Sequence, residues 1–189
     1  MLRAVKNAFL LLLIMTVLTG IIYPLMVTGI AQIIFPRQAD GITVKKGDET
    51  VGYQLIGQEF TSPKYFHSRP SASGYNSLSS GGSNLGPTNK ELLRKVDQTA
   101  KTVRKENEML STDAVPADLV TSSGSGLDPH ISPKSAYIQV NRVAKARNLS
   151  EDTVKNLVDD YTEGRQLGVL GEPRVNVLLL NARLDSIND

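Results

Sequence analysis

The chain has 189 residues, of which 21 are Lys or Arg and 19 are Asp or Glu, so its formal net charge is +2. This near balance gives no electrostatic reason to expect nucleic-acid binding. The absence of Trp, with aromatics at 5%, argues against a surface on which bases stack. Cysteine is absent, which excludes disulfides, thiolate catalysis and cysteine-ligated zinc or iron–sulfur sites.

The N-terminal segment from Ala8 to Phe35 contains no charged residue. This run is longer than the roughly 20 residues that a helix needs to cross a bilayer. Arg3 and Lys6 also give the basic start of a cleaved signal peptide, but the apolar run is longer than a signal core and no A-x-A-like site follows it. We therefore expect residues 1–35 to be an uncleaved anchor and residues 36–189 to form a single soluble domain.

Two features of the anchor indicate more than a passive lipid-facing helix. Gly20 and Pro24 are expected to let it bend in its outer half. Polar side chains along the span favour packing against other membrane helices; they are Thr16, Thr19, Thr28 and Gln32.

The basic residues around the span predict its orientation. Arg3, Lys6 and the terminal amine precede it, whereas Arg37 alone follows closely. Because basic residues favour the cytoplasmic side, we expect a single-pass protein of the cell (inner) membrane with a cytoplasmic N-terminus. The soluble domain would then lie outside the cell or in a periplasm.

The rest of the chain predicts an α+β domain with one small sheet and about three helices. Apolar residues at helical spacing predict that one face of the first helix packs inward; they are Leu92, Leu93, Val96, Ala100 and Val103. In chain order we expect two short strands within 41–60 around a Gly47–Asp48 turn, an ordered surface loop over 61–87, a helix from a Thr88–Glu91 capping box to about Leu110, a helix from Ser132–Pro133 to about Arg147, a helix from Ser150 to Gly164, and a strand over 175–180.

The stretch TSSGSGLDPHISP, residues 121–133, contains the residue types of a serine hydrolase. A G-x-S-x-G elbow around Ser125 would need glycines at 123 and 127, where Ser123 and Leu127 stand. The base would have to be His130 or His67, and we expect no catalytic residues here. A metal site from Asp128, His130 and His67 is disfavoured as well, because neither the spacing nor the ligand number matches a known site type.

Two Gly-rich stretches precede predicted helices and could direct backbone N–H groups at a phosphate. Neither is a Walker loop, because no Lys follows the glycines. We favour structural loops whose Ser and Asn side chains fix turns and helix starts, and nucleotide binding stays open as the alternative. The candidate nucleotide-binding or docking residues are Ser80, Gly81, Gly82, Ser83 and Asn84 in the first stretch, and Ser123, Gly124, Ser125 and Gly126 in the second.

Several motifs in a fixed order make the chain recognisable over nearly its whole length. They are LIGQ at 55–58, YFHSRPSA at 65–72, SGGSNLGP at 80–87, DLVT at 118–121, SGSGLDPHISP at 123–133, QV at 139–140, RVAKAR at 142–147 and GEPRVNVL at 171–178. Together with the single N-terminal span, they resemble the C-subunit (KdpC) family of Kdp-type potassium-transporting P-type ATPases.

The resemblance implies a non-catalytic subunit of an inner-membrane complex that imports potassium at the expense of ATP. Its partners would be an ion-conducting subunit and an ATP-hydrolysing subunit. The family is described as an assembly factor and as a catalytic chaperone that raises the ATP affinity of the ATP-hydrolysing subunit. This implies no tightly bound cofactor or metal, and ATP as a transient ligand at most.

The expected orientation conflicts with direct contact to ATP, because nucleotide domains of P-type pumps are cytoplasmic. Three interpretations therefore stay open: a structural subunit that caps the outer face of the ion-conducting subunit, a nucleotide-binding regulator, and, remotely, an anchored hydrolase acting through Ser125.

Overall fold

The computed structural model describes residues 1–47 and 49–187, in two compact units, Met1–Ile42 and Thr43–Asp189. The first unit contains one continuous helix, Leu2–Ile34, that is long and apolar enough to cross a membrane. This confirms the long apolar N-terminal helix that the sequence predicts, and we refer to this helix as the span. The predicted boundary between anchor and soluble domain, at residues 35 and 36, stays a prediction.

The span changes its winding where the sequence predicts a bend. It is built from α1 (Leu2–Val17), the π-helical turn η1 (Leu18–Ile22) and α2 (Tyr23–Ile34), and the short α3 (Pro36–Ala39) follows it. In the π turn the N–H of Tyr23 donates to the carbonyl of Leu18. Pro24 has no N–H and its ring crowds the carbonyl four residues earlier, on Gly20, so a widened turn just before it relieves that clash.

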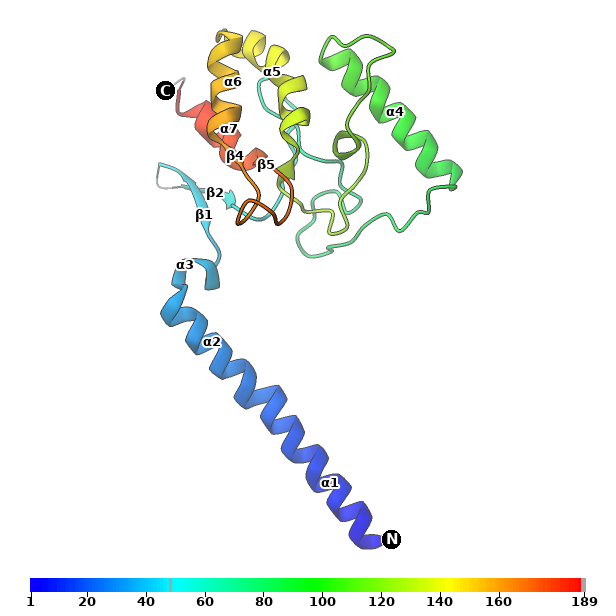
Figure 1. The fold of residues 1–189 in the computed structure, drawn as a ribbon, viewed down its shortest axis with the longest axis vertical. Helices are drawn as coiled ribbons and strands as arrows, with labels where there is room; N and C mark the ends of the chain where they lie inside the picture. Colours follow the sequence, from blue (N-terminus) through cyan, green and yellow to red (C-terminus); the bar gives the residue numbers. More distant parts are fainter. Residues whose placement is uncertain (48, 188–189) are drawn as a thin grey trace. The chain divides into compact units, whose positions relative to one another are not determined.

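The second unit contains two small antiparallel sheets and four helices of nine residues or more (Figure 1). The fold class is α+β, as predicted, but the single expected sheet is two sheets, a β1–β2 hairpin and a three-stranded sheet in the order β3-β5-β4. The elements are β1 (Thr43–Lys46), β2 (Glu49–Tyr53), α4 (Lys90–Glu106), the 3₁₀ turn η2 (Ala117–Leu119), β3 (His130–Ile131), α5 (Pro133–Arg147), α6 (Glu151–Asp160), β4 (Thr162–Glu163), β5 (Arg174–Asn176) and α7 (Val177–Asp185).

The core of this unit lies among α5, α6, α7 and the three-stranded sheet. From the long loop 61–87, Phe66 is the residue that joins this core, and the Phe66 side chain is fully buried. The side chain of Asn181 in α7 accepts from the Phe66 N–H at 2.9 Å and donates to the Phe66 carbonyl at 3.0 Å. Since both backbone groups are satisfied in the interior, this part of the loop is fixed, as predicted. Other buried members include Ile131, Val140, Val143, Val154, Val158, Val175, Leu180 and Leu184.

The predicted strand over 175–180 is wrong for most of its length. Only β5, Arg174–Asn176, is a strand, and Val177 begins α7. The Asn176 side chain accepts from the N–H of Leu179 at 3.1 Å and so caps the helix. A short run of buried apolar residues has no periodicity that separates a strand from a buried helix.

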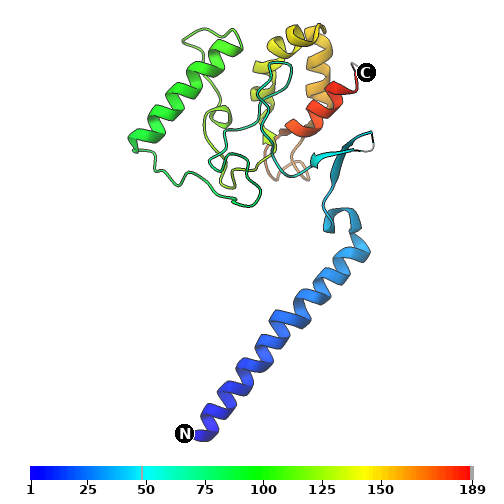
Figure 2. The ribbon, with the colours of Figure 1, turned by 180° about the vertical axis from the view of Figure 1, so that it is seen from behind.

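Helix α4 differs from its prediction at both ends and on its inner face. Its N-cap is Asn89, whose side chain accepts from the N–H of Glu91 at 2.8 Å, so the Thr88–Glu91 capping box is not formed. The helix ends at Glu106, four residues earlier than predicted. Leu93 is 55% exposed and does not face inward. Both ribbon views show α4 apart from the α5–α7 cluster (Figures 1 and 2), which agrees with its having no buried residue.

The other two predicted helices are confirmed. α5 begins after Ser132, whose hydroxyl accepts from the N–H of Ser135, with Pro133 at the first helical position. α6 begins after its predicted cap Ser150, but it ends at Asp160, before Gly164.

Candidate functional site

The two Gly-rich loops singled out in the sequence lie against each other. The carbonyl of Ser125 accepts from the N–H of Gly81 at 2.9 Å and from the hydroxyl of Ser80 at 3.0 Å. A Cβ on Gly82 would come within 3.2 Å of the Gly124 carbonyl oxygen. Gly126 adopts φ +70°, and a Cβ there would meet the Gly81 carbonyl oxygen at 2.8 Å. The glycines therefore allow close approach of two backbones.

This pairing uses backbone donors that a phosphate would need. The N–H of Gly81 is bonded to Ser125, and the N–H of Gly126 donates to the Ser123 carbonyl at 3.3 Å. Neither loop runs directly into a helix, because α4 is capped by Asn89 and α5 by Ser132. The arrangement weighs against a phosphate cradle at these amides. Ser83 and Asn84 follow the contact, and Asn84 adopts a left-handed conformation with φ +53°.

The parts of the hypothetical hydrolase are engaged elsewhere. The Ser125 hydroxyl accepts from the N–H of Leu127 at 3.1 Å. The His130 ring lies 3.3 Å from Asp128, and the His67 ring lies beside Glu106. Within residues 1–47 and 49–187, no group of three Asp, Glu or His side chains is placed to hold a metal ion.

The second half of the 121–133 stretch organises the start of α5. Asp118 accepts from the N–H of Ser132 at 2.6 Å and from the hydroxyl of Ser135 at 2.8 Å. Asp128 pairs with Arg69 at 3.1 Å. Burial alone would raise the pKa of Asp128, but hydrogen bonds from His130 and the Arg69 charge outweigh it and hold that pKa below its usual value.

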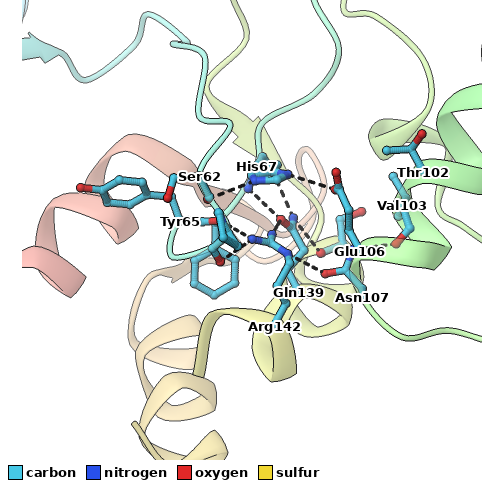
Figure 3. A network of polar contacts seen from close by, with 12 residues as sticks. Ser62, Tyr65, His67, Thr102, Val103, Glu106, Asn107, Gln139 and Arg142 are labelled. Carbon is cyan, nitrogen blue, oxygen red and sulfur yellow. Dashed lines mark hydrogen bonds and ion pairs between the residues drawn. The ribbon is translucent and has the colours of Figure 1, made fainter. Parts of the chain in front are cut away.

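A buried polar network on α5 was not predicted from the sequence (Figure 3). Arg142 donates to the carbonyls of Pro63 and Tyr65 at 2.6 and 2.9 Å, and to the Asn107 side chain at 3.0 Å. It also donates to the Gln139 side chain at 2.7 Å. The sequence does contain one signal for this network. Gln139 and Arg142 are three residues apart, beside Val140 and Val143 on the buried face of the helix, and polar residues at such positions need buried hydrogen-bond partners.

Gln139 and Arg142 together fix the backbone around His67. The Gln139 amide accepts from the His67 N–H at 2.7 Å and donates to the His67 carbonyl at 3.2 Å. Burial lowers the pKa of Arg142 to about 10, so the guanidinium stays charged at neutral pH. Burial and the Arg142 charge also lower the pKa of His67. Figure 3 shows His67 between Ser62 on one side and Glu106 of α4 on the other.

Two clefts lie along the inner side of α4. The smaller, about 260 Å³, is lined by His67, Glu106 and Tyr75 among others. Burial and the nearby Glu59 charge raise the pKa of Tyr75 to about 12. The larger is about 560 Å³, within the range of small-molecule sites.

The larger cleft brings together one of the predicted loops and residues that sequence reasoning missed. Gly82 and Ser83 line it. Four further residues with hydroxyl groups and one lysine line it as well; they are Ser71, Thr99, Thr121, Ser122 and Lys95. Glu91 lines the cleft as well and pairs with Lys95 at 2.7 Å, so the lining offers hydrogen bonds and a balanced pair of charges to a polar ligand. These lining residues include no activated nucleophile.

The family model for the K⁺-transporting ATPase C chain (KdpC) matches residues 5–186. The chain belongs to the KdpC family.

Curated relatives agree with this assignment over their full lengths. The potassium-transporting ATPase KdpC subunit of Methylococcus capsulatus is 51% identical over 190 residues, covering 99% of this chain and 100% of the relative. The KdpC subunit of Bradyrhizobium diazoefficiens is 51% identical over 199 residues, covering 98% of each. That of Mycobacterium bovis is 49% identical over 187 residues, covering 98% and 99%. The one long apolar helix fits a single-pass member of this family.

We expect His67 to make the domain less stable in mild acid. Its pKa is lowered in the folded state, so as the pH falls the unfolded chain takes up the proton first. The contribution of the neutral ring to the free energy of unfolding is fully present above the ordinary histidine pKa. It is lost as the pH falls below that value and through the lower pKa of His67 in the folded domain. Urea unfolding of the full chain in detergent, between about pH 7 and pH 5, measures this loss.

His67→Gln should flatten the pH dependence, because the amide stays neutral. Glu106→Gln should steepen it, because the Glu106 charge raises the pKa of His67 and its removal lets that pKa fall further. An unchanged slope in His67→Gln would contradict this explanation.

Proposed function

We propose that this chain is an accessory, non-catalytic subunit that assembles and stabilises a potassium-transporting ATPase in the cell membrane. Membership of the KdpC family supports this role, because relatives of the same length are named as subunits of that ATPase. Its partners are the other subunits of the pump, namely the ion-conducting and the ATP-hydrolysing subunit, and the membrane.

The observation that best supports an assembling role is the pairing of the two signature loops. The N–H of Gly81 and the hydroxyl of Ser80 both donate to the Ser125 carbonyl, so these donors are used within the domain and are not free for a ligand. The hydroxyl of Ser125 is likewise engaged with Leu127. Loops closed in this way favour a rigid domain that presents a surface to other subunits, and they disfavour the hydrolase interpretation.

In the proposed topology the N-terminus is cytoplasmic and the domain lies outside the cell or in the periplasm. Arg3 and Lys6 precede the span and Arg37 alone follows it closely, which supports this orientation. A domain on that side is separated from cytoplasmic ATP by the bilayer.

We also propose that the subunit raises the ATP affinity of the ATP-hydrolysing subunit, as the family resemblance implies. From outside, it does so by binding one conformation of the pump more tightly than another. A differential affinity of this kind shifts the conformational equilibrium and therefore the ATP affinity of a distant site. This route needs no nucleotide contact with the domain.

A second candidate is a direct nucleotide site in the larger cleft under α4. The volume of about 560 Å³ and the lining hydroxyl groups favour it, and Lys95 could contribute its ammonium group once a ligand displaces Glu91, its partner in the same lining. Phosphate oxygens suit such donors. Gly82 and Ser83 line this cleft too, so the predicted nucleotide-binding stretch would contribute to it.

The assembling role predicts that the span itself contributes to complex formation. Replacing residues 1–35 by an unrelated membrane helix is expected to reduce co-purification of the other pump subunits at least about tenfold, because contacts between membrane helices are lost. A control in which only Leu10, Leu11, Leu12 and Leu13 become Ile should co-purify like the native chain. Equal recovery with the unrelated helix would contradict a specific role for the span.

The orientation is tested with a single cysteine, since the chain has none. Leu78 is 95% exposed, so Leu78→Cys gives an accessible thiol. A membrane-impermeant maleimide is expected to label this variant in intact cells with a permeable outer membrane. Protection until lysis would place the domain in the cytoplasm.

The nucleotide candidate is tested by calorimetric titration of ATP into the purified full chain. If the cleft binds ATP, Lys95→Ala should weaken binding about tenfold, the scale of one lost charge-assisted contact. Lys101→Ala is a matched control, because Lys95 and Lys101 each pair at 2.7 Å with a carboxylate one turn earlier, and only Lys95 lines the cleft. Absence of saturable binding to the native chain would reject this candidate.

A further inference from the structure

The connection between β4 and β5 exposes an unusual amount of apolar surface. We call residues 165–171 the apolar tip. Leu167 is 90% exposed, Val169 72% and Leu170 56%. Large apolar side chains grouped on one protrusion mark interaction sites more often than scattered ones do.

The tip is held in one conformation by its own backbone. Gln166 and Leu170 exchange two hydrogen bonds, at 2.8 and 2.9 Å. The N–H groups of Gly168 and Val169 donate to the carbonyls of Arg165 and Gln166, each at 3.2 Å. Leu167 adopts φ +53°, a left-handed conformation that is costly for a bulky residue. A rigid tip loses little conformational entropy when it binds.

The base of the tip is polar, and its cations are already paired. Arg165 donates to both carboxylate oxygens of Glu172 at 2.8 Å, and Arg174 pairs with Glu163 at 3.0 Å. Glu172, Pro173 and Arg174 also line a cleft of about 330 Å³ together with Arg69, Asp118 and Asp128. An apolar centre beside a hydrogen-bonding rim is the usual anatomy of a protein interface.

Charge distinguishes between a bilayer and a protein as the occupant. Surface-bound protein segments approach anionic lipids through unpaired Lys or Arg and often through Trp. In the described part of the chain, Arg69, Arg165 and Arg174 are each paired with a carboxylate, and the sequence contains no Trp. The carboxylates of Asp128, Glu163 and Glu172 are paired with these same arginines, so the two signs balance at the base of the tip. A balanced polar rim beside an apolar centre suits a protein partner.

We propose that the apolar tip is a docking element, with Leu167 and Val169 seated in an apolar pocket of another pump subunit that has a polar rim. The proposal rests on the proposed function, in which this chain is an assembling subunit. It adds the surface through which the soluble domain contacts a partner.

The first test follows the environment of the tip. Leu167→Cys in the full chain, labelled with an environment-sensitive fluorophore, is expected to shift its emission to the blue only when the other pump subunits are present. The same label on Leu78→Cys, also in an exposed loop, should not shift. A shift in vesicles that contain this chain alone would identify the bilayer as the occupant and overturn the proposal. No shift in the assembled pump would overturn it too.

The second test separates docking from folding. Leu167→Asn removes the apolar contact but suits the left-handed backbone, so the thermal midpoint should not fall. Its affinity for the other subunits is expected to drop about tenfold, as for a buried interface residue. Adding Val169→Thr, which keeps the side-chain shape, should weaken binding further, and Leu78→Asn should leave it unchanged. Binding of Leu167→Asn equal to that of the native chain would refute the proposal.

Failure of the tip proposal is distinguishable from failure of the proposed function. If the native chain does not co-purify with the other subunits, the assembling role itself fails. If the native chain co-purifies and Leu167→Asn does so equally well, only the tip proposal fails.

Discussion

The domain depends on one buried helical face that bonds to the backbone of a distant loop. Arg142 and Gln139 in α5 satisfy the carbonyls of Pro63, Tyr65 and His67 and the N–H of His67. These loop groups have no sheet ladder to pair with. Unpaired backbone groups in the interior are costly, so without the two side chains the loop could not cover the core.

The same physical solution recurs elsewhere in this sheet-poor domain. Side chains and close backbone contacts satisfy backbone groups that neighbouring strands would satisfy in a larger sheet. Arg147 donates to the Lys64 carbonyl at 2.6 Å and pairs with Asp185 at 2.7 Å, and the Gly81–Ser125 contact joins two loops without regular structure. Most of these structural contacts involve residues in the motifs that resemble the KdpC family. A chain built in this way suits a subunit whose contribution to a pump is a fixed shape.

The predictable parts of the fold are those set by one dominant physical signal. The span follows from the thickness of a bilayer, and α5 and α6 follow from Ser caps and apolar periodicity. Leu93 and residues 177–180 were misjudged because burial depends on what packs against a helix, and local pattern does not contain that information. The roles of Gln139 and Arg142 could not be predicted, since the loop backbone that they bind, around Tyr65 and His67, is more than 70 residues away in sequence. The pairing of the two Gly-rich loops is likewise a contact between segments far apart in sequence, since Ser80 and Ser125 are 45 residues apart, and local pattern does not predict it.

The bonds between Phe66 and Asn181 join residues 115 positions apart, and Asn181 lies in the last helix. Contacts of such high sequence separation form late, because the intervening chain must first be brought into place. The core of the soluble domain therefore closes only after α7 has been synthesised and has arrived on the same side of the membrane as Phe66. The span is synthesised before all of these residues, so it can contact neighbouring membrane helices while the core is still open.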